Sequence, residues 1–248
     1  MTLQEFFTLH PKAAVAFSGG VDSAYLLYAA KKYARQTKAY YVKSQFQPHF
    51  ELRDAAKLAQ ELGVDFKILK QDVLSVPHVK ENRADRCYFC KKAIFQTIMA
   101  SARADGFPVL LDGTNASDDA KTRPGMRAMA ELSVLSPLRE CGLTKPKIRR
   151  LSKEAGLFTW DKPAYACLAT RIFTGEEITA EKLVAAEAAE DYLFSLGFQD
   201  FRVRTHNGHA MLQLPLLQLA RVLAYRSDIV AELKKYYQTV SLDLEARG

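Results

Sequence analysis

Apolar runs and helical periodicities alternate along the first two thirds of the chain. The unbroken apolar run at 13–17 predicts a buried strand, and the apolar positions of 24–30 predict a helix directly after it. Further strands are predicted at 39–42, 64–69 and 108–112, and further helices at 51–62 and 88–104. Strands that alternate with helices are typical of a doubly wound parallel sheet, so we expect an α/β fold with helices on both faces.

The pattern changes after about residue 165. Asn207-Gly208 is a strong signal for a two-residue hairpin between two short alternating segments. We therefore expect a small α+β domain at 171–248 after the α/β domain at 1–170. Its predicted elements are a helix at 180–196, strands at 201–206 and 210–214, a helix at 222–237 and a strand at 239–244.

Composition narrows the class of protein but not its ligand. Hydrophobic residues make up 48% of the chain and charged residues 25%, which is typical of a soluble globular protein. No apolar run is long enough to span a membrane, and the N-terminal residues lack the features of a secretion signal, so we expect a cytoplasmic protein. The net charge of +7 suits a nucleic acid or a small polyanion equally well, because the basic residues are spread along the chain.

The turn between the first strand and the first helix has the sequence Ser18-Gly19-Gly20-Val21-Asp22-Ser23. Adjacent glycines can adopt positive φ and let the backbone close on a ligand, and the amides at a helix start suit a pyrophosphate group. Ser23 can cap the helix, and Ser18 can add a hydroxyl donor. The sequence lacks the lysine-containing phosphate loop of the common NTPases. The alternative is a glycine-rich turn without a ligand.

A second polar loop, Asp112-Gly113-Thr114-Asn115-Ala116-Ser117-Asp118-Asp119, follows the strand predicted at 108–112. Ligands of parallel sheets bind beyond the carboxyl ends of the strands, where this loop and the first motif both lie. Its carboxylates, Asp118 among them, are candidates to hold Mg²⁺ against the phosphates of ATP. A helix N-cap with acidic first-turn residues is the alternative. Arg123 could bring a cation to the same edge of the sheet.

Four cysteines in a cytoplasmic protein favour thiols, metal ligands or catalysts over disulfides. Cys87 and Cys90 have the spacing of one helical face, so they can bind one metal centre or take part in redox exchange, with core cysteines as the alternative. Arg171 follows Cys167 closely and can lower the pKa of that thiol or hold a phosphate. Taken alone, a cysteine between alanine and leucine is typical of a small buried side chain. Cys141 has no neighbour that demands a thiol, and we interpret it as structural.

Arg202 and Arg204 stand two positions apart in the strand predicted at 201–206. Side chains of a strand alternate between the faces of the sheet, so both guanidinium groups lie on one face. Two arginines on one face can bind a phosphate group, and a solvated strand face is the alternative.

The 18–23 motif after a strand resembles the PP-loop of the ATP pyrophosphatases, which have the adenine nucleotide alpha hydrolase-like fold. These enzymes cleave ATP between the α and β phosphates and adenylate an oxygen of the substrate. Over nearly its whole length the chain resembles the ATP-dependent sulfur transferases of the LarE type, which help to make a nickel-pincer nucleotide cofactor. The resemblance rests on the segments 18–23, 112–115, 162–163, 167–171, 202–204 and 242–244.

The resemblance implies both a reaction and a site. ATP, with Mg²⁺ on its phosphates, would adenylate a carboxylate of pyridinium-3,5-biscarboxylic acid mononucleotide, and a sulfur nucleophile would displace AMP to give a thiocarboxylate. In the sacrificial version, the cysteine that matches Cys167 gives up its own sulfur and becomes dehydroalanine. Arg202 and Arg204 would hold the substrate phosphate, Asp243 would lie in the same site at the domain junction, and Arg171 is a further phosphate candidate. The nucleotide would be bound by the 18–23 motif together with Gly113, Thr114 and Asn115.

Cys87 and Cys90 depart from the simplest sacrificial pattern. Some relatives resemble three-cysteine enzymes, in which a 4Fe-4S cluster carries the transferable sulfide on its open iron. Here the three ligands would be Cys87, Cys90 and Cys167, and the enzyme would turn over without losing its own sulfur. The three motif cysteines together favour this variant, and the sacrificial route is the alternative.

Three rival classes fit the sequence less well. A tRNA-thiolating PP-loop enzyme would carry an RNA-binding element, which the small C-terminal region lacks, so we do not expect nucleic acid as a partner. An amide-forming synthetase would leave the three motif cysteines unexplained, and a regulatory nucleotide-binding module would not need the carboxylates near the phosphate loop. We expect a small-molecule nucleotide substrate, a homo-oligomer and a downstream cofactor-biosynthesis protein as a partner.

Overall fold

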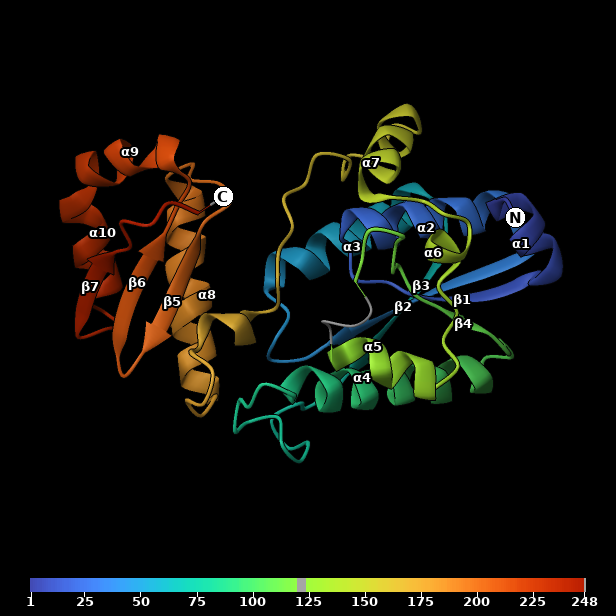
Figure 1. Cartoon of the computed structure of the whole chain (residues 1–248), viewed down its shortest axis with the longest axis horizontal. Helices are drawn as coiled ribbons and strands as arrows, with labels where there is room; N and C mark the ends of the chain where they lie inside the picture. The colour runs from blue at the N-terminus through green and yellow to red at the C-terminus, as the bar shows by residue number, and fades with distance from the viewer. Residues whose placement is uncertain (120–123, 248) are drawn as a thin grey trace. The chain divides into compact units, whose positions relative to one another are not determined.

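The structure is a computed structural model that describes residues 1–119 and 124–247. Its internal contacts divide the chain into two units (Figure 1). The first unit comprises Met1–Val76 and Cys87–Lys162, and the second comprises Pro77–Arg86 and Pro163–Gly248. The sequence placed the boundary after residue 170, whereas these contacts divide the chain at Lys162 and add a short earlier segment to the C-terminal unit.

The first unit is built on a four-stranded sheet in the order β3-β2-β1-β4. All its pairings are parallel, and the central β1 pairs with β2 through Val15 and Ala39 and with β4 through Val15 and Leu111. The side chains of β1 are almost fully buried, as expected for a strand covered on both faces. The predicted parallel α/β sheet is confirmed. Its strands are β1 (Lys12–Ala16), β2 (Gln36–Lys43), β3 (Asp65–Lys70) and β4 (Leu110–Leu111).

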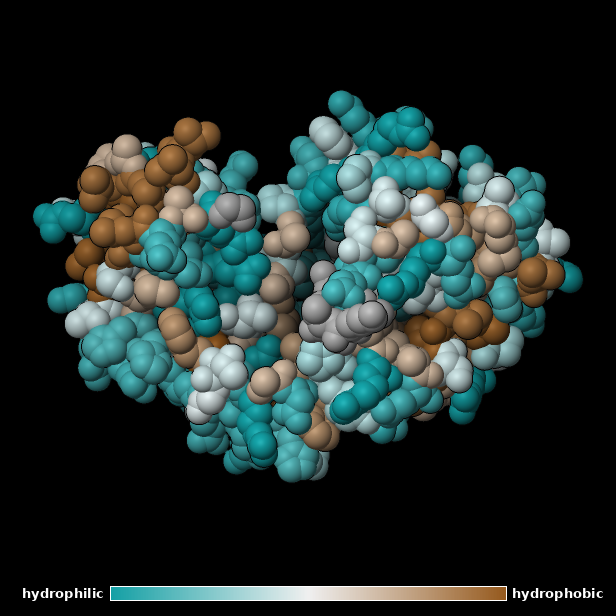
Figure 2. Space-filling model, in the orientation of Figure 1, coloured by the Kyte–Doolittle hydropathy of each residue, from teal (hydrophilic) through white to brown (hydrophobic). Residues whose placement is uncertain are grey.

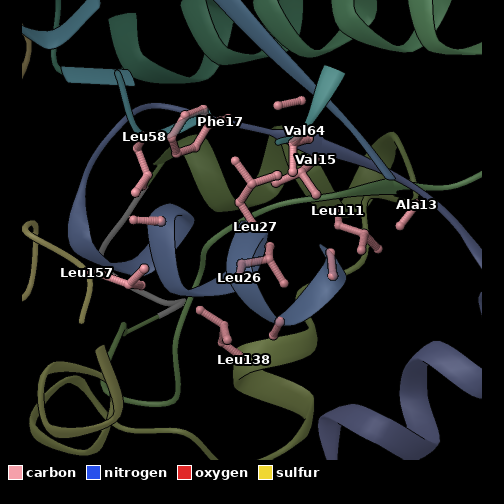
Figure 3. Close-up of a cluster of buried hydrophobic side chains, with 14 of the residues drawn as sticks. Ala13, Val15, Phe17, Leu26, Leu27, Leu58, Val64, Leu111, Leu138 and Leu157 are labelled. Carbon is pink, nitrogen blue, oxygen red and sulfur yellow. The ribbon is translucent and has the colours of Figure 1, made fainter. Parts of the chain in front are cut away.

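Helices cover both faces of this sheet (Figure 1). One face is covered by α1 (Leu3–Leu9), α2 (Val21–Tyr33), α3 (His49–Glu61), α6 (Pro137–Glu140) and α7 (Lys145–Glu154). The other face is covered by α4 (Arg86–Ala104) and α5 (Pro124–Glu131). The larger core lies on the first face, where Val15, Leu27 and Leu58 pack together (Figure 3). This packing fixes the start of α2 at the carboxyl end of β1.

The second unit contains a three-stranded sheet in the order β5-β6-β7. The predicted hairpin at Asn207-Gly208 is confirmed: both residues have positive φ, and the strands on either side pair antiparallel. The last strand pairs parallel to β6. The elements are η1 (Leu168–Arg171), α8 (Ala180–Ser195), β5 (Arg202–His206), β6 (His209–Gln213), η2 (Leu216–Gln218), α9 (Leu219–Ala224), α10 (Arg226–Leu233) and β7 (Thr239–Leu242).

Several helices differ from the sequence prediction. The helix predicted at 222–237 is two helices, α9 and α10, because Tyr225 between them leaves the helical conformation and packs its ring against Phe198. The short helices α1, α5 and α6 and the longer α7 were not predicted. Each of the four has ten residues or fewer, which is too few for a helical period to stand out from the surrounding sequence.

Hydrophobic side chains gather on the surface of the second unit around α9 (Figure 2). Leu216, Leu217 and Leu223 are 69%, 94% and 65% exposed. None of the helices at 1–119 or 124–247 is long and apolar enough to cross a membrane. The predicted homo-oligomer stays a prediction.

Candidate functional site

The turn from β1 to α2 presents uncapped backbone amides at the carboxyl edge of the sheet. Gly19 has a φ of +77°, and a Cβ at this position would lie 3.2 Å from the carbonyl oxygen of Glu51 in α3, so glycine suits both the backbone and the space. Gly20 is the N-cap of α2, and no side chain caps the helix. The first amides of a helix have no acceptor within the helix. The 18–23 loop is therefore shaped to receive an anion.

Ser23 supports the loop in a different way from that predicted. The prediction that Ser23 caps α2 was wrong, because Gly20 takes the extended backbone of the N-cap and Ser23 lies within the first turn. The Ser23 hydroxyl donates to Gly20 O at 3.1 Å and accepts from Ser18 N–H at 3.3 Å. Its oxygen lies 3.1 Å from the Ser18 hydroxyl. These contacts fix the conformation of the loop.

The 112–119 loop lies against the start of α2, because β4 is the neighbour of β1 in the sheet. A Cβ on Gly113 would lie 2.8 Å from the backbone nitrogen of Ser23, so no larger residue permits this approach. Asp112 is buried and accepts from the Thr114 and Ser136 hydroxyls. The loop and the first motif thus meet at one place, as predicted.

Asp118 is part of the turn that follows. Its Oδ2 accepts from Asn115 N–H at 3.0 Å, and Asn115 itself is buried. Arg139 donates to the backbone oxygen of Asp118 at 3.1 Å. The role of Asp118 as a Mg²⁺ ligand stays a prediction, and Arg123 lies outside the described residues.

Asp22, in the first turn of α2, has one paired and one unpaired carboxylate oxygen among the described residues. Its Oδ2 accepts from Lys145 Nζ at 2.5 Å. Its Oδ1 is buried and has no hydrogen-bond partner among the residues that the structure describes. A buried carboxylate oxygen without a donor is a good ligand for Mg²⁺, so Asp22 fits the metal that ATP requires. Sequence reasoning missed Lys145, and no local signal in the sequence points to its contact with Asp22.

In the second unit, β5 carries two arginines on the face of the sheet opposite to the core. Val203 and Thr205, which alternate with them, are buried. Neither Arg202 nor Arg204 forms an ion pair with a described residue, and Arg204 Nε is buried without a hydrogen-bond partner there. Burial, followed by the charge of Arg171, lowers the pKa of both guanidinium groups. Two half-buried cations that form no ion pair within the described chain favour binding of an anion.

Asp243 lies on the same face of this sheet. Its Oδ2 accepts from Gln213 Nε2 at 2.8 Å, and Gln213 stands directly opposite Arg202 in the β5–β6 pairing. Asp243 also interacts electrostatically with Arg204. The structure therefore brings together three residues that the sequence analysis assigned to one site.

Arg171 has a different environment from these arginines. Its side chain is fully buried, and its Nε and Nη2 donate to the two carboxylate oxygens of Glu190 at 2.8 and 2.9 Å. Its Nη1 donates to Ala166 O and to the Thr170 hydroxyl. Burial alone would lower the pKa of Arg171, but the hydrogen bonds to Glu190 outweigh it and raise that pKa. These donors have acceptors inside the unit, so Arg171 has little hydrogen-bonding capacity left for a phosphate group, and that role stays a prediction.

Comparison with known proteins places this site in a family. The sequence model of the asparagine synthase family matches residues 10–119, which contain both loops of the first unit. An uncharacterized protein of Synechocystis is 36% identical over 98% of this chain and 92% of its own length. Pyridinium-3,5-bisthiocarboxylic acid mononucleotide synthase of Lactiplantibacillus plantarum is 33% identical over 94% of this chain and 86% of its own length. The chain belongs to the LarE family. It is an ATP-dependent sulfurtransferase with a PP-loop.

A more distant relative shares only part of the chain. A tRNA-specific 2-thiouridylase of Thermotoga is 25% identical over 59% of this chain and 52% of its own length. The similarity to the LarE-type relative covers nearly all of this chain. The comparisons therefore favour the LarE family over the tRNA-thiolating enzymes.

The cysteines of this LarE-type enzyme are divided between the two units. Cys87 and Cys90 lie near the start of α4, and Cys167 precedes η1 in the second unit. Over the described ranges, no group of three or more His, Cys, Asp or Glu side chains is placed to hold a metal ion. The 4Fe-4S cluster at Cys87, Cys90 and Cys167 stays a prediction. Burial raises the pKa of the Cys141 thiol, in agreement with a structural role.

Proposed function

We propose that this LarE-type enzyme converts a carboxylate of pyridinium-3,5-biscarboxylic acid mononucleotide into a thiocarboxylate. The Lactiplantibacillus relative is named for the bisthiocarboxylic product. The observation that carries the proposal is the pair Arg202 and Arg204, two half-buried cations without an ion pair in the described chain, on a protein that also has a PP-loop. Adenylation of a phosphorylated carboxylic acid needs both features: one site for ATP and another for the phosphate of the substrate.

The PP-loop would bind the phosphates of ATP with the backbone amides at the start of α2. Mg²⁺ held by Asp22 Oδ1, with Asp118 as a second ligand, would neutralise part of the phosphate charge. A carboxylate oxygen of the substrate attacks the α-phosphorus. The bond from the α-phosphorus to the bridging oxygen breaks, its electron pair leaves with pyrophosphate, and an acyl adenylate remains.

Arg202 and Arg204 would bind the phosphate of the substrate mononucleotide. Both are presented by one strand, and Arg204 is held with its guanidinium carbon 4.1 Å from the centre of the Phe173 ring. Such stacking fixes the plane of the guanidinium group, so its N–H donors keep one direction. The arginines therefore orient the substrate as well as attract it.

The sequence leaves two sulfur sources open, and the sacrificial route is the one that the protein's own residues can complete, with Cys167 as the sulfur donor. Its thiolate attacks the acyl carbon and displaces AMP, which leaves a thioester on Cys167. Loss of the Cys167 α-proton then breaks the Cβ–S bond, so the thiocarboxylate is released and dehydroalanine remains. Arg171 interacts electrostatically with Cys167 and donates to the neighbouring Ala166 O, so the buried Arg171–Glu190 pair holds this segment.

The mass of the intact protein after reaction tests the sulfur donor. Anaerobically purified protein is mixed with ATP, Mg²⁺ and the biscarboxylated mononucleotide, after its visible spectrum has been recorded. We expect AMP, thiolated product and a loss of about 34 Da that maps to Cys167, because the elimination removes one H₂S. The Cys167→Ser variant should keep its mass. An unchanged wild-type mass with thiolated product and a brown chromophore would overturn the sacrificial donor in favour of the cluster at Cys87, Cys90 and Cys167.

The phosphate site has a separate test. Arg202→Met and Arg204→Met should each raise the KM for the mononucleotide by about tenfold or more, because each removes a charge-assisted contact. The affinity for ATP should stay the same. Arg226→Met, which removes an exposed arginine of the same unit, is the matched control. KM values in Arg202→Met and Arg204→Met that equal those of Arg226→Met and the wild type would refute the assignment. AMP formation only with tRNA would show that tRNA is the acceptor.

A further inference from the structure

A short segment from an early part of the chain belongs to the second unit. This segment, Pro77–Arg86, is here called the strap, and the chain before and after it belongs to the first unit. The strap backbone accepts two hydrogen bonds: Asn82 O accepts from Gly175 N–H at 2.9 Å, and Lys80 O accepts from Ile178 N–H at 2.8 Å. The strap is therefore paired with the segment that follows η1.

Asn82 binds to both sides of this pairing through its side-chain amide. It is 1% exposed and has a φ of +53°, in the left-handed region that asparagine tolerates better than most residues. Its Nδ2 donates to Phe173 O at 2.8 Å and to Ile172 O at 3.3 Å, and its Oδ1 accepts from Arg86 Nη1. Asn82 thus binds the backbone at 172–173 and orients the Arg86 side chain.

Arg86, the last residue of the strap, is buried next to η1. It is 8% exposed, and its Nη1 donates to Ala169 O at 3.2 Å. Ala169 is fully buried and lies within η1, two positions after Cys167. Burial of a guanidinium group is costly unless its N–H donors find acceptors. Because Asn82 and Ala169 supply such acceptors, the position of η1 depends on that of Arg86.

The backbone around Cys167 is held by two arginines from different parts of the chain. Arg171 Nη1 donates to Ala166 O at 2.7 Å, only five positions away in the sequence. Arg86 donates to Ala169 O across 83 positions. One contact lies before Cys167 and the other after it. Since the direction of a side chain follows from its backbone, the two contacts together fix where the Cys167 thiol points.

We propose that Arg86, oriented by Asn82, is a positioning residue that holds Cys167 for the sulfur-transfer step. The proposal rests on the proposed function, which assigns the attack on the acyl carbon to Cys167. That attack needs the sulfur about 3–3.5 Å from the acyl carbon, and a displacement of about 1 Å can cost about 10²-fold in rate. Adenylation comes earlier and does not use the thiol. Loss of the Arg86 contact therefore slows sulfur transfer and leaves adenylation intact.

The rate at which iodoacetamide alkylates Cys167 tests the position of the thiol without any substrate. Mass spectrometry of the cysteine peptides follows each thiol separately. Cys167 is half-buried, and release of η1 exposes it, so we expect Arg86→Met to raise its alkylation rate by about fivefold or more. The rate at Cys141, in the first unit, should change less than about twofold. Arg83→Met removes an exposed arginine of the strap and, as the matched control, should change neither rate.

Single-turnover kinetics separate positioning from a general loss of structure. Arg86→Met should slow thiocarboxylate formation by about tenfold or more, while pyrophosphate release and the half-saturating mononucleotide concentration change less than about twofold. Arg86→Lys keeps a cationic donor and should recover part of this loss. The melting temperature of each variant checks that it is folded.

Two results would overturn the proposal. One is an unchanged alkylation rate of Cys167 in Arg86→Met, and the other is equal slowing of pyrophosphate release and thiocarboxylate formation in that variant. If the wild type releases no pyrophosphate with the mononucleotide, the proposed function itself fails. The alkylation rates then decide by themselves whether Arg86 positions Cys167.

Discussion

Removal of one partner of the buried Arg171–Glu190 pair is expected to destabilise the second unit strongly. Each side chain is 1% exposed. The Glu190 carboxylate accepts from Arg171 Nε and Nη2, from the Tyr165 hydroxyl at 2.5 Å and from Val203 N–H at 2.9 Å. Glu190→Leu would leave the guanidinium without a counter-charge in an interior that water does not reach. Breaking a buried pair in this way costs about 3–5 kcal/mol of unfolding free energy.

The double variant isolates the electrostatic part of this cost. Arg171→Leu with Glu190→Leu removes both charges, and replacement of a whole buried pair by apolar residues is often close to neutral. We therefore expect the double variant to be more stable than Glu190→Leu by about 2 kcal/mol or more. Lys80→Met is the control in the same unit: its exposed contact with Glu177, at 3.5 Å, is worth less than about 1 kcal/mol.

Urea unfolding followed by far-ultraviolet circular dichroism measures these free energies. Hydrogen exchange of a β5 peptide adds a local readout, because the Val203 amide donates directly to Glu190. Protection of that amide should fall in Glu190→Leu and not in Lys80→Met. A loss below about 1 kcal/mol in Glu190→Leu, or strictly additive costs in the double variant, would refute the account of a tightly coupled pair.

Two further predictions concern the first unit. Gly113→Ala should weaken ATP binding and cost about 1–3 kcal/mol of stability, because its Cβ would lie 2.8 Å from Ser23 N; an unchanged Kd by titration calorimetry would contradict this. Hydrogen bonds from Lys67 and then Tyr40 lower the pKa of Asp105 from 3.8 to about 2. Since the folded pKa is the lower one, this stabilisation is complete above about pH 4 and is lost as the pH falls through about 2. Urea midpoints should therefore fall less steeply with acid in Asp105→Asn than in wild type, and parallel curves would rule the linkage out.

Local sequence determined the first βα unit and the hairpin of the second unit. The apolar run before Ser18 requires a covered strand, the paired glycines permit a turn, and the apolar spacing after Ser23 requires a helix. Asn207-Gly208 likewise accepts the positive φ values of a tight hairpin turn. Arg202 and Arg204 share a face because strand side chains alternate, whatever the rest of the fold does.

Tertiary packing alone decided which distant groups meet. Lys145 reaches Asp22 across 123 positions of sequence. Glu190 pairs with Arg171 only because α8, which carries Glu190, packs against η1, which ends at Arg171. The sequence makes Arg171 and Arg202 equally good candidates for a phosphate site. In the folded structure, however, Arg171 pairs with Glu190 inside the unit, whereas Arg202 has no ion pair in the described chain. Local preferences set the backbone of each element over a few residues, whereas burial and charge pairing depend on which faces the whole chain brings together. For that reason the sequence determined the phosphate-binding loop, and the folded structure determined the partners of its charges.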